Sequence, residues 1–362
     1  MILRLHPFAL FTLAVGTLLP AAESPPLRWG SSALRQKPEW YASAAAHSAA
    51  TTVLGYQSEV GAWPKNTDLL APATPAALAA VAKGGLANTI DNGATTTPLR
   101  FLALVATASQ DGTFHAPILR GVDYLLASQY ANGGFPQFYP LRKGYYSHIT
   151  FNDDAMIDAL TLLRDIAESR EPFRIIDSAQ RARAADAVKR GVACILQTQI
   201  NHEGRVTVWC AQHDEQTLAP AWARKYEPPS LSGAESVGVV RFLMSVAMPS
   251  PEIVAAIEGA VGWFRAVPIT GRRIKSLPQL GGKPDALLVD DPAAPPLWAR
   301  FYELGTNRPL YMDRDSKPLY DFALVSYERR SGYHYHTTSP ALLLDRDYPA
   351  WRARLAATFN AK

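Results

Sequence analysis

The stretch "LLASQYANGGF" (residues 125–135) joins the end of an apolar helical run to a glycine turn and an aromatic residue. Two further stretches follow the same order, "LGYQSEVGAW" (54–63) and "LQTQINHEGRV" (196–206). Each contains Leu-x-x-Gln and then a turn glycine. These glycines are Gly61, Gly133 and Gly204. Their spacing of about 70 residues matches two helices with their connections, so the sequence predicts a repeat of helix pairs.

A second series of helical runs alternates with the first. Its members are "TIDNGATTTPLRFLALVATAS" (89–109), "TFNDDAMIDALTLLRDIAES" (150–169) and "PSLSGAESVGVVRFLMSVA" (229–247). Each run opens with Asp, Asn or Ser, which are favourable N-cap residues. If the repeats close into a toroid, the starts of this second series lie at one end of it. The two acidic pairs would then converge there.

The remaining chain predicts further helices and one irregular region. Residues 171–199 and 251–265 read as helices, and a last helix is expected over 348–358. Proline and glycine are dense from 266 to 300, which indicates a long irregular segment, and long loops in compact domains are often functional. We therefore expect one domain, with a helical part over about 40–265 and an irregular lobe with short strands over about 266–345.

The N-terminus has the pattern of a secretory signal. Residues 1–22 combine Arg4, an apolar stretch and the small residues Ala21 and Ala22, so we expect cleavage near 22–24 and a secreted or periplasmic protein. The formal net charge of +4 is spread over scattered Lys and Arg. No basic block indicates a nucleic-acid partner, and we expect a monomer. Cys194 and Cys210 could form a disulfide or remain as two buried thiols.

The acidic pairs allow two interpretations. Asp91 and Asn92, with Asn152, Asp153 and Asp154, could cap their helices by accepting free amide hydrogens. They could also bind a metal ion, because carboxylate and amide oxygens are the ligands that Ca²⁺ selects. The matched positions in two repeats favour a shared site at which the same residues do both.

Cationic and aromatic residues form a second group. They occur in "WPKNTD", "RKGYYSHITFND", "WARKYEPPS" and "ARFYELGTNRPLYMDRD". Arginine forks and aromatic faces suit sugar rings that carry carboxylates. No Ser-His-Asp spacing, zinc-protease motif or phosphate-binding glycine loop is present in the sequence.

Six motifs together resemble the pectate lyases of polysaccharide lyase family 10. They are "GAWPKNTDL" (61–69), "TIDNGATTTPLRFLA" (89–103), "GGFPQFYPLRKGYYSHITFNDDAM" (133–156), "YEPPSLSGAESVGVVRFLM" (226–244), "WARFYELGTNRPLYMDRD" (298–315) and "YERRSGYHYH" (327–336). They follow one another over nearly the whole chain. The resemblance implies a mainly α fold, an (α/α)₃-type toroid with an irregular lobe, and calcium-assisted β-elimination of polygalacturonate to 4,5-unsaturated products.

The resemblance also implies a set of site residues. It places calcium on Asp91, Asn92 and Asp153 and assigns an arginine as catalytic base, for which Arg314 is the best match. Arg300 matches a substrate-carboxylate arginine, and Arg308 is the rival for either role. The expected substrate-binding residues are Lys65, Tyr146, His148, Arg224, Lys225 and Tyr302. Family members usually read Gly-Arg-Asp-Gly around the base, where this chain reads Asp-Arg-Asp-Ser.

Two other functions remain open from the sequence. An inverting glycoside hydrolase on a similar toroid could use Asp153 and Glu235 as acid and base. A non-catalytic pectin-binding protein could use the same calcium site and arginines only to hold substrate. A lyase with an arginine base predicts activity that rises into alkaline pH, because arginine ordinarily stays protonated.

Overall fold

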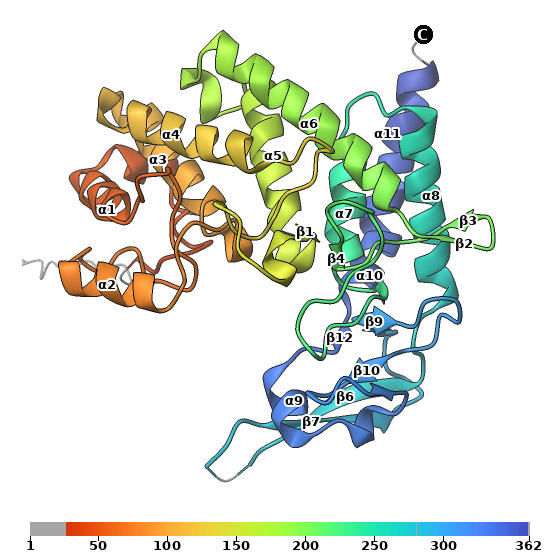
Figure 1. The fold of residues 1–362 in the computed structure, drawn as a ribbon. Helices are drawn as coiled ribbons and strands as arrows, with labels where there is room; N and C mark the ends of the chain where they lie inside the picture. The colour runs from red at the N-terminus through yellow and green to blue at the C-terminus, as the bar shows by residue number, and fades with distance from the viewer. Residues whose placement is uncertain (1–26, 280, 361–362) are drawn as a thin grey trace, which may run out of the picture.

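The computed structural model describes residues 27–279 and 281–360. The predicted signal peptide at 1–22 lies outside these residues. Helices dominate the described chain, and paired helices follow one another from α1 to α8 before the chain enters a lobe of strands (Figure 1). The predicted helical toroid with an irregular lobe is confirmed. Among the described helices, none has the length and apolar character needed to cross a membrane.

The helices lie close to the predicted ranges. They are α1 (Ala44–Leu54), α2 (Pro75–Lys83), α3 (Thr96–Ser109), α4 (His115–Ser128), α5 (Ala155–Ala167), α6 (Ser178–Thr198), α7 (Glu235–Met244), α8 (Pro251–Ala266), α9 (Tyr327–Gly332), α10 (Ser339–Leu342) and α11 (Tyr348–Asn360). Two short 3-10 turns precede the second-series helices, η2 (Asp91–Gly93) before α3 and η5 (Asn152–Asp154) before α5.

The strands are short and lie mainly in the lobe. They are β1 (Ile149–Thr150), β2 (Asn201–His202), β3 (Arg205–Val206), β4 (Gln212–His213), β5 (Leu231–Ser232), β6 (Arg272–Leu277), β7 (Asp285–Asp290), β8 (Trp298–Ala299), β9 (Phe301–Tyr302), β10 (Tyr311–Met312), β11 (Pro318–Leu319) and β12 (His336–Thr337). The antiparallel hairpin β6–β7 and α9 form the end of the lobe (Figure 1).

The repeated glutamine connects successive first-series helices. Gln57 Nε2 donates to the carbonyl of Pro117 in α4 at 2.9 Å. In the same way Gln129 donates to Ala187 of α6 at 2.8 Å, and Gln199 donates to Ala256 of α8 at 2.9 Å. These bonds satisfy carbonyl groups within packed helices. A buried carbonyl group without a hydrogen-bond partner would cost free energy. The Leu-x-x-Gln pattern therefore marks helix-to-helix contacts of the toroid.

The turn glycines are equivalent in two repeats and different in the third. Gly61 and Gly133 have positive φ, and a Cβ there would lie 2.3 Å from Arg120 O and 2.1 Å from Arg190 O. Only glycine lets the turn approach the next helix this closely. Gly204 meets no atom within 4 Å, because the β2–β3 hairpin lengthens the third turn. Gly204 does have positive φ in a turn, as the pattern predicts, but it makes no close approach to the next helix.

Extended segments around the toroid mouth repeat the same pairing. Thr89 bridges Phe138, β1 pairs with β4, and β5 pairs with β9. In each case the segment that leads into a second-series helix is antiparallel to the segment after the next turn. This ladder holds the starts of α3, α5 and α7 next to the segments that follow each turn. The next residues along these segments form the candidate site.

Two buried clusters correspond to the toroid and the lobe. The larger runs through the helix pairs and includes Trp351 of α11, so the chain returns to the toroid after the lobe. Figure 1 shows α11 beside α8. The smaller cluster lies in the lobe and contains Tyr226 and Tyr335 among its buried aromatic residues. Cys194 and Cys210 are free buried thiols, so the possible disulfide between them is absent.

Candidate active site

The turns η2 and η5 have the same backbone conformation. Asn92 has φ 53° and ψ 31°, and Asp153 has φ 50° and ψ 35°. Both lie in the left-handed region, which Asn and Asp tolerate better than most residues. The residue before each is buried, Asp91 at 3% exposure and Asn152 at 8%, and the two turns are in contact. The sequence prediction that the acidic pairs meet at one end of the toroid is consistent with this contact.

The capping interpretation holds only for the third run. Neither η2 nor η5, nor the helices α3 and α5 that follow, has a side-chain cap. The left-handed residue turns the chain so that these carboxylates and amides lie away from the free N–H groups. In the third run, Ser232 Oγ accepts from the N–H of Glu235 at 3.0 Å. The acidic residues of the first two turns are therefore available for another role.

Asp91 has one paired and one unpaired oxygen. Lys65 Nζ donates to Asp91 Oδ2 at 2.6 Å. Asp91 Oδ1 is buried, and no described residue donates a hydrogen bond to it. A buried polar atom without a partner is uncommon, because leaving it unsatisfied costs about 1–3 kcal/mol. The unpaired oxygen therefore points to a ligand that supplies the missing contact.

Arg300 connects the second turn to α7. Its Nη2 donates to Asn152 Oδ1 at 3.1 Å and to Asp153 Oδ1 at 3.3 Å, and it also forms an ion pair with Glu235. Burial alone would lower the pKa of Arg300, but Glu235, Tyr333 and Asp153 outweigh it and raise that pKa above its usual range. Arg300 is thus a fixed cation beside Asp153 and is not suited to accept a proton.

Lys65 and Arg300 occupy equivalent repeat positions. Each follows a buried Trp by two residues, Trp63 and Trp298, whose indole N–H groups donate to Val53 and Phe264 at the ends of first-series helices. Gln137 follows Phe135 in the same way. The remaining repeat departs from this motif, because the equivalent Trp209, whose indole N–H donates to Ile195, is followed two positions later by Ala211.

A strip of arginines and tyrosines leads from Arg300 into the lobe. Arg300 Cζ lies 4.9 Å from the centroid of the Tyr333 ring, and Tyr333 OH donates to Glu227 Oε1 at 2.8 Å. Arg224 Nε donates to the same carboxylate at 2.7 Å, and its Cζ lies 5.0 Å from the ring centroid of Tyr226. Tyr333 and Glu227 have no assigned role in the sequence analysis, because neither their spacing nor their type sets them apart.

Arg314 completes this strip from the lobe. It lies 5.5 Å from the Tyr226 ring centroid and lines a pocket of about 470 Å³ with Arg224 and Lys225. Its guanidinium pairs with Glu328 at 3.0 Å, and this hydrogen bond raises the pKa of Arg314. Glu328 therefore favours the charged form of the base predicted from the resemblance.

The Asp-Arg-Asp-Ser loop has its own supports. Asp313 accepts from the N–H of Ser326 at 2.7 Å and from its hydroxyl at 3.0 Å. Ser316 has φ 61°, a conformation that glycine adopts more readily. The serine thus keeps the left-handed turn for which the usual glycine is suited, and Asp313 attaches the loop to the start of α9.

Two expected site residues have other environments. Tyr302 is fully buried, with its hydroxyl donating to Val267 O at 2.8 Å, so the expectation that it binds substrate is wrong. Arg308 is exposed and stacks 3.7 Å from the centroid of the Tyr320 ring. The adjacent Asn307 accepts from Trp263 of α8, and no described contact joins Arg308 to the two acidic turns.

His148 belongs to a separate cluster with metal-ligand geometry. His148, Asp214 and Glu215 each offer an atom within 4.8 Å of the others, and His148 Nδ1 lies 2.9 Å from Glu215 Oε2. Tyr146 packs against Tyr145 with ring centroids 4.2 Å apart. The sequence analysis did not include Asp214 or Glu215, although both follow β4, the strand paired with the segment that carries His148.

Two acidic groups lie behind the turns. Burial raises the pKa of Asp154 to about 7, with Asp158 and Glu235 adding to the effect. Burial also raises the pKa of Asp158 to about 6. Asp154 packs against Gly238, where a Cβ would fall 1.9 Å from its Oδ1. Asp158 is half-buried in α5, whereas Asp154 remains exposed beside α7.

Comparisons with known proteins agree with this arrangement. A family model described as pectic acid lyase matches residues 57–344. A solved structure of a family 10 polysaccharide lyase from Cellvibrio cellulosa is 36% identical, with a TM-score of 0.73, over 83% of this chain and 91% of that one. A mutant from the same organism, in complex with trigalacturonic acid, is 35% identical, with a TM-score of 0.73, over 83% and 92%. No curated protein sequence matches the chain.

Proposed function

The chain belongs to the pectic acid lyases of polysaccharide lyase family 10, and we propose that it is a calcium-dependent lyase that cleaves polygalacturonate by β-elimination. The observation that carries the proposal is the contact between two left-handed turns that hold Asp91, Asn92 and Asp153 beside the cation Arg300. The related mutant with trigalacturonic acid supports the same substrate class.

The residues of the two turns fit a calcium ion. Asp91 and Asp153 offer carboxylate oxygens and Asn92 an amide oxygen, the hard donors that calcium prefers. The buried Asp91 Oδ1 without a protein partner is the observation that favours an additional ligand here. These three residues would hold the ion. When bound, calcium would act as a Lewis acid toward the substrate carboxylate and stabilise the charge that develops on it.

The cations of this chain have distinct roles in the proposed reaction. β-Elimination removes the proton at C5 of a galacturonate unit and expels the oxygen at C4, so negative charge accumulates on the adjoining carboxylate. Arg300 is preorganised by Asp153 and Glu235 to stabilise that charge. Arg224 and Lys225 line the neighbouring pocket and would bind carboxylates of adjoining sugar units.

Arg314 is the proposed base. An arginine can accept the C5 proton only when its surroundings disfavour the guanidinium. Arg329 and Arg224 gather around the same Tyr226 ring, and Arg329 acts to lower the pKa of Arg314, against the opposing effect of Glu328. Substrate that separates Arg314 from Glu328 would leave the arginine among cations. The proposal therefore predicts a rate that rises toward alkaline pH.

One assay tests the proposed function. The protein is incubated with polygalacturonate at alkaline pH, and the ultraviolet absorbance of the 4,5-unsaturated product is followed with calcium and with EDTA. We expect absorbance to rise with calcium and to stop with chelator. New reducing ends without absorbance would instead indicate a hydrolase that uses Asp153 and Glu235. Binding without either product would indicate a non-catalytic pectin-binding protein.

The proposed place of action is outside the cytoplasm. The signal pattern at 1–22 supports secretion or periplasmic export, where the polymer is available. Cell fractionation checks this, since a secreted protein is recovered in the periplasm or medium with its first residue near 23.

A further inference from the structure

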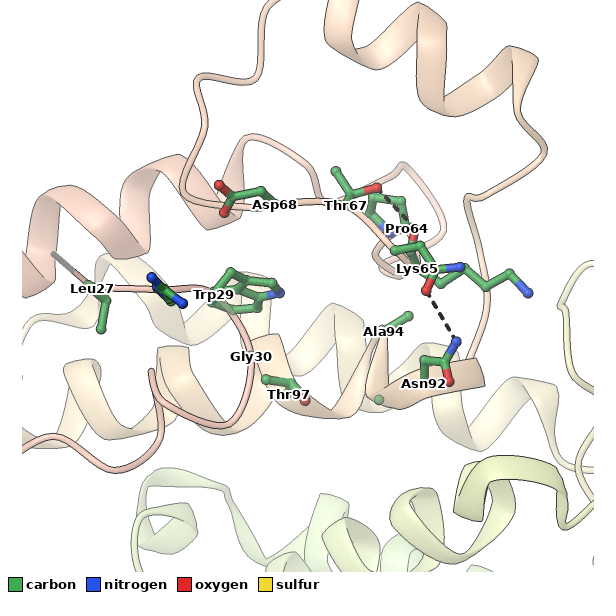
Figure 2. A pocket seen from close by; sticks show the side chains of 13 residues that line it. Leu27, Trp29, Gly30, Pro64, Lys65, Thr67, Asp68, Asn92, Ala94 and Thr97 are labelled. Atoms are coloured by element: carbon green, nitrogen blue, oxygen red, sulfur yellow. Dashed lines mark hydrogen bonds between the residues drawn. The ribbon is translucent and has the colours of Figure 1, made fainter. Parts of the chain in front are cut away.

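A second pocket adjoins the candidate calcium residues on the side of η2. It has a volume of about 540 Å³ and lies between the segment 27–30 and the loop 64–68. Figure 2 shows Trp29 in its wall, facing the region between Asp68 and Thr97. Lys65 and Asn92 line the same pocket. A sugar bound there would therefore be next to the unit that the two acidic turns hold.

The segment that carries Trp29 is attached firmly to the toroid. Ala33 is fully buried, and Tyr41 OH donates to its carbonyl at 3.0 Å. The Trp29 ring lies perpendicular to the buried Phe101 ring of α3, with centroids 5.8 Å apart. These contacts fix the indole in the pocket wall before any ligand binds, which reduces the entropy that binding would otherwise lose.

The polar residues of the pocket match a galacturonate unit. Arg28 is exposed, and within the described chain no carboxylate forms an ion pair with it, so its guanidinium can bind a uronate carboxylate. The Asp68 carboxylate accepts only from the N–H of Leu70 among the described residues, which leaves oxygen positions for sugar hydroxyls. Asn66 Oδ1 accepts from Asn92 Nδ2 at 3.2 Å, so the pocket and the first acidic turn are joined.

One side of this wall lies outside the part of the chain that the family model matches. The family model matches residues 57–344, so Arg28 and Trp29 lie outside the matched part, whereas Lys65, Asp68 and Asn92 lie within it. The shared residues form one side of the pocket and the N-terminal segment adds the other. A property that depends on Trp29 would therefore distinguish this chain from relatives that share only the matched part.

We propose that Trp29 and Arg28 form an additional sugar subsite, in which the indole packs against a galacturonate ring and Arg28 binds its carboxylate. The inference rests on the proposed function, since it extends the proposed substrate site by one sugar unit. The subsite would favour longer oligogalacturonides over short ones. An indole ring typically supplies a large apolar contact area on its face and a polar N–H group at its edge.

The test compares chain lengths in Trp29→Ala and Arg28→Ala. Rates of unsaturated product formation are measured on trigalacturonate and hexagalacturonate, and affinities are measured by calorimetry with EDTA present. For each variant we expect hexagalacturonate affinity and kcat/KM to fall about five- to tenfold, with trigalacturonate values nearly unchanged. Equal losses on both substrates, or no loss on either, would overturn the subsite.

Trp40→Ala is the matched control. Trp40 also packs on Phe101, with centroids 6.3 Å apart, but it does not line the pocket. We expect it to lower the melting temperature as Trp29→Ala does while keeping the wild-type ratio of long to short substrate. A change in that ratio in Trp40→Ala would overturn the assignment. Wild-type protein that yields no unsaturated product refutes the proposed function itself, a result separate from either outcome.

Discussion

Arg300 and Arg314 belong to two regions of the site, the toroid mouth and the lobe, and their surroundings differ. The Arg300 side chain is 12% exposed and contacts Asp153 and Glu235. The Arg314 side chain is 61% exposed and has Glu328 as its partner on the surface. A buried cation between fixed carboxylates keeps its charge and position. An exposed cation on one surface carboxylate can exchange that carboxylate for a substrate group, so the lobe is the region in which the partner of the arginine can change.

The largest expected effect tests the lobe side of this comparison. Arg314→Ala removes the proposed base, and we expect turnover of polygalacturonate to fall by at least about 100-fold while binding to the polymer is retained. Arg308→Ala is the control and should stay near wild type, because Arg308 stacks on Tyr320. An inactive Arg308→Ala with a normal Arg314→Ala would reverse the assignment of the base.

The next effect tests the toroid side. Asp153→Ala removes a proposed calcium ligand, and we expect the calcium concentration at half-maximal activity to rise at least about tenfold. Calorimetric titration with calcium and oligogalacturonate gives an independent measurement of affinity. Asp158→Asn, in the first turn of α5 after η5, is the control for general damage to this helix. An unchanged calcium titration in Asp153→Ala would exclude Asp153 from the site.

A third expected effect concerns the contribution of the ion pair between Lys65 and Asp91 to stability. Lys65→Met leaves the Asp91 carboxylate buried without its cation, so we expect the free energy of unfolding to fall by about 3 kcal/mol. Adding Asp91→Asn to this variant removes the unpaired charge and should restore much of the loss. Denaturant unfolding measures both variants. A loss within the error of the measurement would mean that water, rather than Lys65, neutralises Asp91.

The smallest expected effect concerns Glu328, the surface carboxylate that pairs with Arg314 in the lobe. Glu328→Gln removes the carboxylate that raises the pKa of Arg314, so more of the arginine is neutral at a given pH. We expect the rising limb of the pH–rate profile to move to lower pH. Glu303→Gln, which alters the lobe carboxylate bound by Tyr320, is the control and should leave the profile in place. A shift to higher pH would contradict the proposed base.

The helix-pair repeat and the contacts between its helices were predictable because they depend on local sequence patterns. Leu-x-x-Gln and the aromatic positions recur in the sequence, and the structure uses Gln57, Gln129 and Gln199 for the same helix contact. Gln57 and Gln129 also donate to the carbonyls of Gly61 and Gly133. Gly204 departed from this pattern because the β2–β3 hairpin adds residues, so the second carbonyl that Gln199 reaches is that of Thr207. Such an insertion is not apparent when only the glycine spacing is compared.

The site was less predictable because burial and long-range contacts decide it. Tyr302 and Tyr333 are the same residue type in neighbouring motifs, yet Tyr302 is enclosed by Val267 and Ala299, whereas Tyr333 lies beside Arg300. The helix caps expected at Asp91 and Asn152 did not form, because a left-handed residue follows each. Backbone conformation of this kind is set by the surrounding ladder, which the sequence does not show directly.

The Trp298 indole offers a route for protein engineering. Its N–H donates to the carbonyl of Phe264 at the end of α8. With this contact the chain resumes the toroid pattern after its excursion through the β6–β7 hairpin. Because the entrance and exit of this excursion are joined by the Ile269–Leu297 bridge, the hairpin leaves and rejoins the toroid at one point, and its own contacts are with the lobe. We expect a shortened hairpin to leave the frame of the toroid intact, so the lobe can be varied by engineering separately from the helix pairs.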